Sequence, residues 1–369
     1  MIYQIKPVIG VNSKKKLIGY IKKNNWLTEY KYTTEFEKKF AIFTNSKNCI
    51  TFPNGTTTLT SILDCLNLKR GDEVLVSNYT MIATANAARF LGLKVNLVDI
   101  AKSDLCMCPH DLKKKISKKT KMILVENPGS NTFEFQDLSK ITNLARRKKI
   151  YTLLDNTWGT PLYLKPLKLG FDMSFCSATK YFSGHSDAMG GSLAVNKKVY
   201  SKIMFFYKLS GYRMSADEAY LIIRGLRTLD TRLKQHSENT KAVISFLKKQ
   251  KKVKEILYPY NPSSKNYKLW KKYYSGATGL LSIVIKSKKK SSVISFVNSL
   301  ELFGIGYSWG GFESLAILQE IKSSKKDAYL KGRQYYRFKN DEFIVRLHIG
   351  LEDPKDLIND LRKSFKKIK

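Results

Sequence analysis

The stretch from Phe175 to Val195 constrains the fold of this chain more than any other segment. It begins with an apolar run, passes through the small hydroxylic residues Ser177 and Thr179, and continues past Lys180 into a glycine-rich loop. A second apolar run follows this loop. The pattern predicts a strand, a tight turn and a second strand, with Lys180 at the end of the first strand.

A lysine in this setting suits an enzyme that forms a Schiff base. Its amine has to be held at a fixed point, and hydroxyl groups beside it can bind a phosphate group. A solvated lysine on a loop is the common alternative in a chain with 66 lysines and arginines. Asp155, which ends an earlier apolar run, favours the first interpretation. A carboxylate at a buried strand end can pair with a protonated pyridine nitrogen.

These two segments together resemble the large domain of the fold-type I pyridoxal 5'-phosphate (PLP) enzymes. More narrowly, LLDNTW (153–158) and SATKY–GHSDAMGG (177–191) are similar to motifs of the Cys/Met-metabolism PLP family. The resemblance is closest to the cystathionine β-lyases over about residues 121–369, where GYSWGGFESLAI (306–317) and VRLHIGLEDPKDLINDL (345–361) belong to it. It implies an α/β fold with a mostly parallel seven-stranded large domain and a smaller C-terminal α/β domain.

Residues 1–120 resemble another branch of the same fold. The segments FPNGTTTL (52–59) and GDEVLVSNYTMIATANAARFLG (71–92) are similar to the DegT-type nucleotide-sugar aminotransferases. The chain is therefore interpreted as a composite of two branches. Three alternatives to a β-lyase stay open: a nucleotide-sugar aminotransferase, a γ-synthase or γ-lyase of the Cys/Met family, and a PLP-fold protein kept for binding or assembly.

The resemblance also implies roles for single residues. Lys180 is expected to bind PLP covalently and Asp155 to pair with its ring nitrogen. The expected cofactor-phosphate ligands are Ser177, Thr179, Gly55 and Thr56, the expected ring-stacking residue is Met81 with Tyr79 as its substitute, and the expected substrate-carboxylate ligands are Arg346, Ser308, Trp309 and Tyr307. The family's Tyr-x-Arg pair for the neighbouring subunit's phosphate is not evident, and Tyr30 and Tyr32 are its candidate replacements.

The implied activity is that of a PLP-dependent carbon–sulfur β-lyase. It would cleave L-cystathionine or a related S-substituted cysteine to a thiol such as homocysteine, pyruvate and ammonia, as in transsulfuration and methionine biosynthesis. The substrate is then a small amino acid. PLP enzymes of this fold generally build the site across a dimer and this family usually forms tetramers, so a homo-oligomer, either a dimer or a homotetramer, is expected.

Charge and cysteine content limit the partners. The formal net charge is +36, but the lysines lie in short runs along the whole chain, which favours solvated faces over a nucleic-acid or membrane partner. The five cysteines show no framework spacing, and Cys106 and Cys108 are too isolated to predict a zinc site, so no metal is expected. No apolar run reaches membrane-spanning length and no signal-peptide core begins the chain, which predicts a cytoplasmic protein.

The expected organisation has three parts. An N-terminal arm covers residues 1–45, the PLP-binding large domain residues 46–235, and the small domain residues 236–369. In the arm, helices are expected over 14–24 and within 26–44, the second capped by Thr33 or Thr34. Buried parallel strands are expected at 72–78 and 94–100. Residues 211–250 should form one or two helices capped by Ser215.

Overall fold

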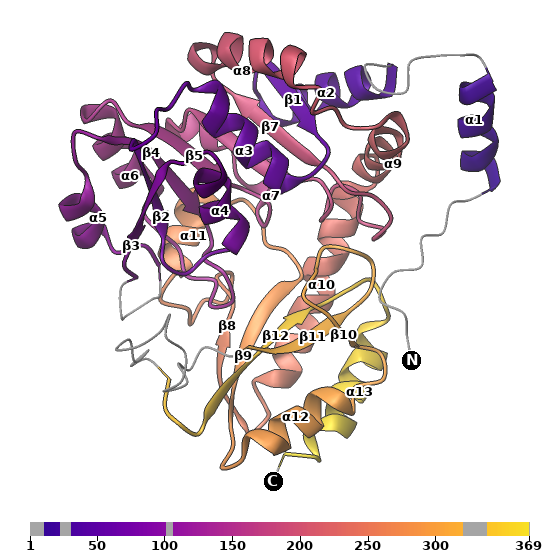
Figure 1. Cartoon of the computed structure of the whole chain (residues 1–369). Helices are drawn as coiled ribbons and strands as arrows, with labels where there is room; N and C mark the ends of the chain where they lie inside the picture. Colours follow the sequence, from indigo (N-terminus) through magenta and orange to yellow (C-terminus); the bar gives the residue numbers. More distant parts are fainter. Residues whose placement is uncertain (1–10, 23–30, 101–105, 320–337, 369) are drawn as a thin grey trace.

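A seven-stranded sheet forms the centre of the larger lobe (Figure 1). The structure is a computed structural model that describes residues 11–22, 31–100, 106–319 and 338–368. The sheet order is β1-β7-β6-β5-β4-β2-β3, and β7 runs antiparallel to both of its neighbours while the remaining pairs are parallel. The strands are β1 (Asn48–Phe52), β2 (Glu73–Ser77), β3 (Lys94–Val98), β4 (Thr120–Glu126), β5 (Tyr151–Asp155), β6 (Met173–Ser177) and β7 (Gly191–Val195). The mostly parallel seven-stranded sheet is confirmed.

A five-stranded sheet forms the smaller lobe, in the order β10-β11-β12-β9-β8 (Figure 1). Only β10 and β11 are parallel, and the other neighbours are antiparallel. The strands are β8 (Val253–Leu257), β9 (Leu280–Lys286), β10 (Gly304–Ile305), β11 (Leu315–Gln319) and β12 (Glu342–His348). The second α/β lobe is thus confirmed.

Helices cover both faces of the large sheet and one side of the small one. The helices are α1 (Val11–Lys22), α2 (Lys31–Thr44), α3 (Gly55–Cys65), α4 (Ile82–Phe90), α5 (Pro109–Lys115), α6 (Leu138–Arg147), α7 (Thr160–Tyr163), η1 (Pro166–Leu169, a 3-10 helix), α8 (Lys197–Ser210), α9 (Ala216–Leu226), α10 (Leu229–Leu247), α11 (Tyr267–Tyr273), α12 (Lys290–Asn298) and α13 (Pro354–Phe365). Among the helices that the structure describes, none combines the length and the apolar character needed to cross a membrane.

Side-chain alternation along the strands creates the layers. Leu75 and Ile123 join the core beneath α6, whereas the next residues along, Val76 and Leu124, join the core beneath α3, α4 and α8. The core beneath α6 continues without a break into the small lobe, where Leu281 and other β9 residues pack against α12 and α13. The two sheets therefore share one apolar core, and their polar ends meet at a common junction.

The predictions for helix caps and for the burial of the last strand differ from the structure. The helix α2 spans Lys31–Thr44, so Thr33 lies buried inside it and does not cap it. The strand β3 is expected to be buried but is mostly only half-buried, because it is the last strand of the sheet. Ser215 does precede α9, yet its hydroxyl donates to Glu218 Oε2 at 3.0 Å.

Residues 211–250 contain two helices, α9 and α10, in place of one continuous helix. The expected boundary between the large and small domains, at residues 235 and 236, falls inside α10. Figure 1 shows α10 running from the large lobe alongside the small sheet. The three-part division of the chain therefore stays a prediction, with α10 common to both lobes.

Candidate active site

Lys180 lies in the turn that follows β6. Its backbone N–H donates to Ser177 O at 3.2 Å, and its carbonyl accepts from Gly184 N at 3.0 Å. Its Nζ donates to Ser308 Oγ at 2.8 Å and lies 5.5 Å from the centre of the Trp309 ring. Burial first, and then the positive charge of Arg346, lower the pKa of Lys180 to about 8. A usable fraction of this amine is thus neutral and nucleophilic near neutral pH.

Asp155 ends β5, the strand next to β6 in the sheet. Its Oδ1 accepts from the Thr157 N–H at 2.9 Å and from Thr157 Oγ1 at 2.5 Å. Thr157 Oγ1 also accepts from Ser177 N at 2.9 Å and so ties the ends of the two strands together. Burial raises the pKa of Asp155, while the Thr157 hydrogen bonds and the charge of Lys180 lower it. The carboxylate is thus held rigidly at the sheet end.

Glu126 is a second, half-buried acid that sequence reasoning missed. It ends β4 and is the register partner of Asp155, so both side chains leave the same face of the sheet. Its carboxylate accepts from Thr80 Oγ1 and from Ser130 Oγ, each at 2.7 Å. Burial, aided by the charge of Asp155, raises the pKa of Glu126 to about 7. The same signal that identified Asp155, an acid closing an apolar run, could have found it.

The expected phosphate-binding positions come partly together. The helix α3 begins at Gly55, where an added Cβ would lie only 2.9 Å from the Phe175 ring, so the helix start packs directly on β6, which ends at Ser177. Asn54 caps the helix by accepting from the Thr57 N–H at 2.8 Å. The N–H groups at the very start of a helix have no intrahelical partner and can bind an anion.

Two other expected phosphate ligands are engaged within their own surroundings. Thr179 Oγ1 accepts from Gly190 N at 3.0 Å and donates to Gly190 O at 3.4 Å, so this hydroxyl closes the lysine turn. The ring of Tyr32 packs edge-on against Tyr220 at 4.9 Å between centroids. Tyr30 lies outside the described residues.

Met81 and Tyr79 differ in their placement. Met81 precedes α4 and is 63% exposed, which leaves its side chain available for contact with a ring. Tyr79 packs against the small-lobe cluster that includes Val284, and its Oη accepts from Asn131 Nδ2 at 2.9 Å. Tyr79 therefore links the lobes, and its role as a substitute for Met81 on the cofactor ring stays a prediction.

Arg346 on β12 completes the junction from the small lobe. Its Nη2 donates to Tyr307 O at 2.6 Å, and within the described ranges no carboxylate pairs with it. Tyr307 itself is 79% exposed, so its carbonyl and not its ring contacts the guanidinium. The Arg346 fork faces the same region as Ser308 and Trp309, which contact Lys180. An unpaired guanidinium beside an amine suits recognition of a carboxylate.

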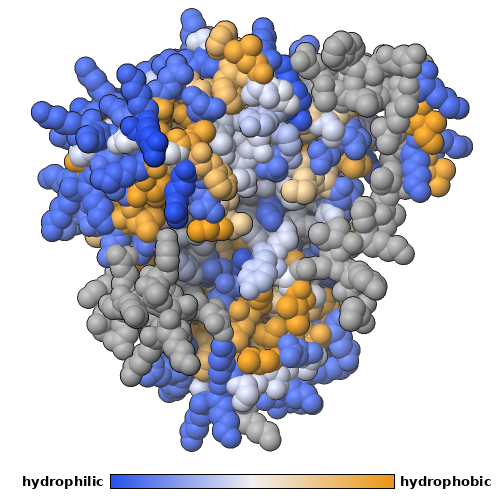
Figure 2. All heavy atoms as spheres, in the orientation of Figure 1, coloured by the Kyte–Doolittle hydropathy of each residue, from blue (hydrophilic) through white to orange (hydrophobic). Residues whose placement is uncertain are grey.

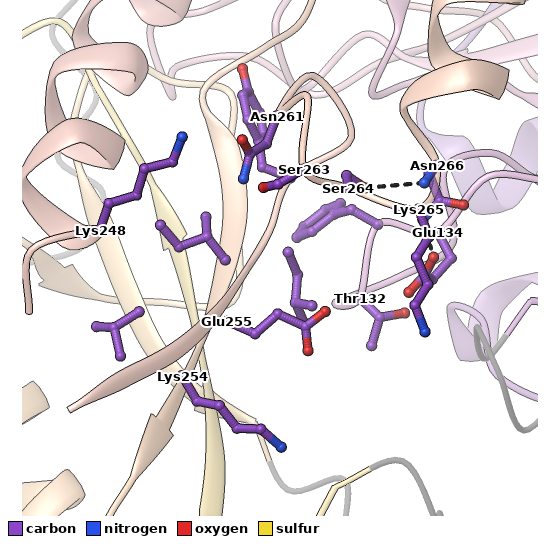
Figure 3. Close-up of a pocket in the computed structure, with 15 residues that line it drawn as sticks. Thr132, Glu134, Lys248, Lys254, Glu255, Asn261, Ser263, Ser264, Lys265 and Asn266 are labelled. Atoms are coloured by element: carbon purple, nitrogen blue, oxygen red, sulfur yellow. Dashed lines mark hydrogen bonds between the residues drawn. The ribbon is translucent and has the colours of Figure 1, made fainter. Parts of the chain in front are cut away.

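A small cavity of about 60 Å³ lies between these groups. Its lining includes Glu126, Asn131, Asp155, Trp309 and Arg346. A larger cavity of about 300 Å³ lies between β8 and residues 261–266 (Figure 3). The lining of the larger cavity contains neither Lys180 nor Asp155. Lys180 lines neither of these two cavities, but the smaller one is lined by Asp155, Arg346 and Trp309, and the Trp309 ring lies 5.5 Å from the Lys180 amine. The candidate site is therefore assigned to the smaller cavity, at the junction of the lobes.

Residues 23–366 match the Cys/Met metabolism PLP-dependent enzyme family. The chain belongs to this family. Its cofactor is pyridoxal 5'-phosphate, as the lysine and aspartate motifs led us to expect. The match begins at residue 23 and so includes most of the segment that resembled DegT-type aminotransferases; the comparisons give that resemblance no support.

Several relatives span most of this family member. A cystathionine beta-lyase of Bordetella avium is 33% identical over 89% of this chain and 80% of its own length. A cystathionine gamma-lyase of Rattus norvegicus is 33% identical over 89% of this chain and 81% of its own. A Rhizobium johnstonii protein is 38% identical and an L-alanine/L-glutamate racemase of Wolbachia pipientis wMel 35% identical, but this chain spans only 61% and 63% of their lengths.

The fold agrees with the family. The crystal structure of a cystathionine gamma synthase from Xanthomonas oryzae pv. oryzae aligns with a TM-score of 0.79 over 92% of this chain and 86% of that one, at 24% identity. The donor set also fits PLP: an amine of lowered pKa, a half-buried carboxylate on the adjacent strand and a helix start beside them. Fold-type I architecture and the PLP cofactor are thus confirmed.

Proposed function

We propose that this enzyme is a carbon–sulfur β-lyase acting on L-cystathionine or a related S-substituted cysteine. Water and the substrate would give the thiol, pyruvate and ammonia. The observation that supports this most is the contact of Lys180 with Ser308 beside Arg346, whose guanidinium has no carboxylate partner within the described ranges. A free α-amino acid supplies that carboxylate, whereas a nucleotide sugar does not.

PLP, when bound, supplies an electron sink for the substrate carbon next to the amine. Lys180 takes up the Cα proton and returns a proton to the departing sulfur. Arg346, with Ser308 and the Trp309 backbone, holds the substrate carboxylate. Asp155 stabilises positive charge on the ring nitrogen. Ser177, Gly55 and Thr56 would hold the cofactor phosphate, together with Thr179, whose hydroxyl here bonds to Gly190, and Met81 would contact the ring.

A γ-elimination is the second candidate, because the Rattus norvegicus relative is a cystathionine gamma-lyase at the same identity as the β-lyase of Bordetella avium. Racemisation shares the first step, the removal of the Cα proton by a basic amine. The lysine and arginine geometry serves all three reactions. The three reactions differ in what happens to the substrate after this proton is removed, and the β-lyase proposal specifies that later step.

The decisive experiment is an assay of pyruvate release from L-cystathionine by the PLP-loaded protein. We expect release by the wild type and none by Lys180→Ala. Arg346→Leu should lower kcat/KM by about 100-fold through the lost bidentate contact, whereas Leu at the exposed Arg227 should not. Release of 2-oxobutyrate and cysteine would favour γ-elimination, and an L-amino acid that only loses its optical rotation would favour racemisation. Full activity in Lys180→Ala would refute the proposal.

A homo-oligomer in the cytoplasm is part of the same proposal. Figure 2 shows apolar atoms exposed on the viewed face of both lobes. Large apolar side chains that are at least 40% exposed include Ile82, Phe90, Met189, Phe205, Leu209, Leu302, Ile305 and Phe312. Apolar surface of this kind is typical of interfaces between subunits. Light scattering should give the mass of a dimer or tetramer, and a monomer would contradict this part of the proposal.

A further inference from the structure

Residues 307–314, here called the serine–tryptophan loop, carry two of the proposed substrate ligands and are held at several points. Lys180 Nζ donates to the hydroxyl of Ser308, and Arg346 donates to the carbonyl of Tyr307. At the far end, Ser314 N donates to Glu352 Oε1 at 2.7 Å. In the middle of the loop, Phe312 O accepts from Leu351 N at 2.8 Å and Glu313 Oε1 accepts from Ser186 Oγ at 2.6 Å. The remaining contacts described here are made by His348.

His348 bonds to the loop through both ring nitrogens. It lies on β12, on the strand that carries Arg346, and is 1% exposed. Gly310 N–H donates to His348 Nε2 at 3.0 Å, and His348 Nδ1 lies 3.0 Å from Glu313 O. A carbonyl can only accept, so Nδ1 carries the hydrogen, and Nε2 must be bare to accept from Gly310. The contacts therefore require a neutral imidazole in one tautomer, and burial, which lowers the pKa of His348 well below its usual value, favours that form.

The loop backbone presses directly on the lysine turn at Gly310. This glycine has a φ of +88°, and an added Cβ would lie 2.8 Å from Tyr181 N and 3.0 Å from the Lys180 backbone carbon. Only glycine suits such a conformation and such an approach. A shift of Gly310 would therefore move the neighbouring Ser308 and Trp309 relative to the Lys180 amine.

We propose that His348 is a positioning residue for the reaction: its two hydrogen bonds fix the serine–tryptophan loop against Lys180. The inference rests on the proposed function only in taking Lys180 as the reacting amine. His348 touches neither substrate nor cofactor in this assignment and acts through Gly310 and Glu313. It adds a requirement for one histidine tautomer to a site otherwise described by Lys180, Asp155 and Arg346.

Three substitutions separate the two hydrogen bonds. In His348→Gln the side-chain amide can reach the place of Nε2 and keep the contact with Gly310. In His348→Asn the shorter amide can reach the place of Nδ1 and keep the contact with Glu313. His348→Leu keeps neither. The control is His110→Leu, because His110 is an exposed histidine on α5, an element of the large lobe that carries none of the proposed site residues.

The first readout is hydrogen exchange of the loop in the cofactor-free protein. We expect faster exchange over residues 307–314 in His348→Leu, near-normal exchange in His348→Gln, and no change in His110→Leu. The second is the pH titration of the cofactor–lysine absorbance without substrate, which should shift in His348→Leu because Lys180 loses its fixed neighbours. The groups that face Lys180 there are Arg346, Asp155 and Ser308.

The third readout is turnover. A misplacement of about 1 Å of the groups around Lys180 can lower the rate about 100-fold, so we expect a loss of that size in kcat/KM for His348→Leu. We expect kcat/KM to be lowest in His348→Leu, higher in His348→Asn and highest in His348→Gln. Loop exchange and an absorbance titration in His348→Leu that match the wild type would overturn the proposal. So would a His348→Asn variant that recovers more than His348→Gln. If the wild type releases no pyruvate, the proposed function fails, while exchange and titration still decide the role of His348.

Discussion

Arg232 offers the sharpest test of how the lysine turn is held. Its guanidinium, 6% exposed, has no acidic partner among the described residues and instead donates to backbone carbonyls: Tyr181 O at 2.8 Å, Phe182 O at 3.4 Å and Gly225 O at 2.7 Å. Gly184 wraps over it with a φ of +65°, and an added Cβ there would lie 2.0 Å from Arg232 Nη1. Replacing Arg232 by leucine therefore removes the group that hydrogen-bonds to the carbonyls of the lysine turn and packs against Gly184.

The magnitude follows from the carbonyls left behind. Gly225 O keeps other donors, since Thr228 N and Thr228 Oγ1 both reach it at 3.1 Å. Tyr181 O and Phe182 O would lose this donor, and each buried unsatisfied acceptor costs about 1–3 kcal/mol. Leucine avoids the cost of burying a cation, which offsets part of this loss. We expect Arg232→Leu to lower the free energy of unfolding by about 2–4 kcal/mol.

The assay is urea unfolding of the cofactor-free protein, read as the shift in the midpoint. Arg224→Leu on α9 is the control, because Arg224 is exposed and a surface change of this kind is expected to stay within about 0.5 kcal/mol. Arg232→Lys should fall between the two, since an ammonium cannot reach all the carbonyls that the fork reaches. Equal midpoints for Arg232→Leu and Arg224→Leu would refute the reasoning.

Three further outcomes follow from the same geometry. Cofactor loading of the apoprotein should speed up with pH and level off above about 8, the pKa of Lys180, in stopped-flow absorbance. The pKa of Glu126 is about 7 in the folded protein and 4.5 in the unfolded chain, so the stability that this group contributes is fully present below pH 4.5 and is lost as the pH rises through 7. In Glu126→Gln, the urea midpoint should therefore depend less on pH over this range. Gly225→Ala should cost about 1–3 kcal/mol by the same assay, because its Cβ would lie 2.1 Å from Phe182 O.

The centre of the large sheet could be predicted from the sequence because its signals are local. An apolar run that ends in a polar residue at a sheet end indicated Asp155 and Lys180, and β5 and β6 lie side by side as that interpretation requires. Gly55, expected as a phosphate ligand, lies at the start of helix α3. The predicted burial of β3 was wrong, because the burial of a strand at the sheet edge depends on which strand comes last in the sheet and not on the strand's own residues.

The junction between the lobes could not be predicted from local patterns. Ser308 and Arg346 were proposed through the family resemblance, and the contact of Ser308 with Lys180 joins segments from different sheets. His348 gave no signal of its own, since a histidine in an apolar strand usually reads as a core residue. Glu126 carried the same pattern as Asp155, and only its register pairing with Asp155 in the sheet shows the two acids on one face.

One face of α10 contacts both the lysine turn of the large lobe and the segment that follows β12 in the small lobe, and so fixes the distance between them. Arg232 donates to the carbonyl of Tyr181, directly after Lys180. His236 and Asn239 follow Arg232 at helical spacing on the same face of α10. His236 bonds to Ile349 O at 2.7 Å, and Asn239 Nδ2 donates to Gly350 O at 3.0 Å. Each partner is a backbone carbonyl, which every residue supplies, so the contacts fix position without depending on the side chains they meet. A rigid helix with one end on the lysine turn and its middle on the segment after β12 leaves the Lys180 amine and the Arg346 guanidinium little freedom to move apart.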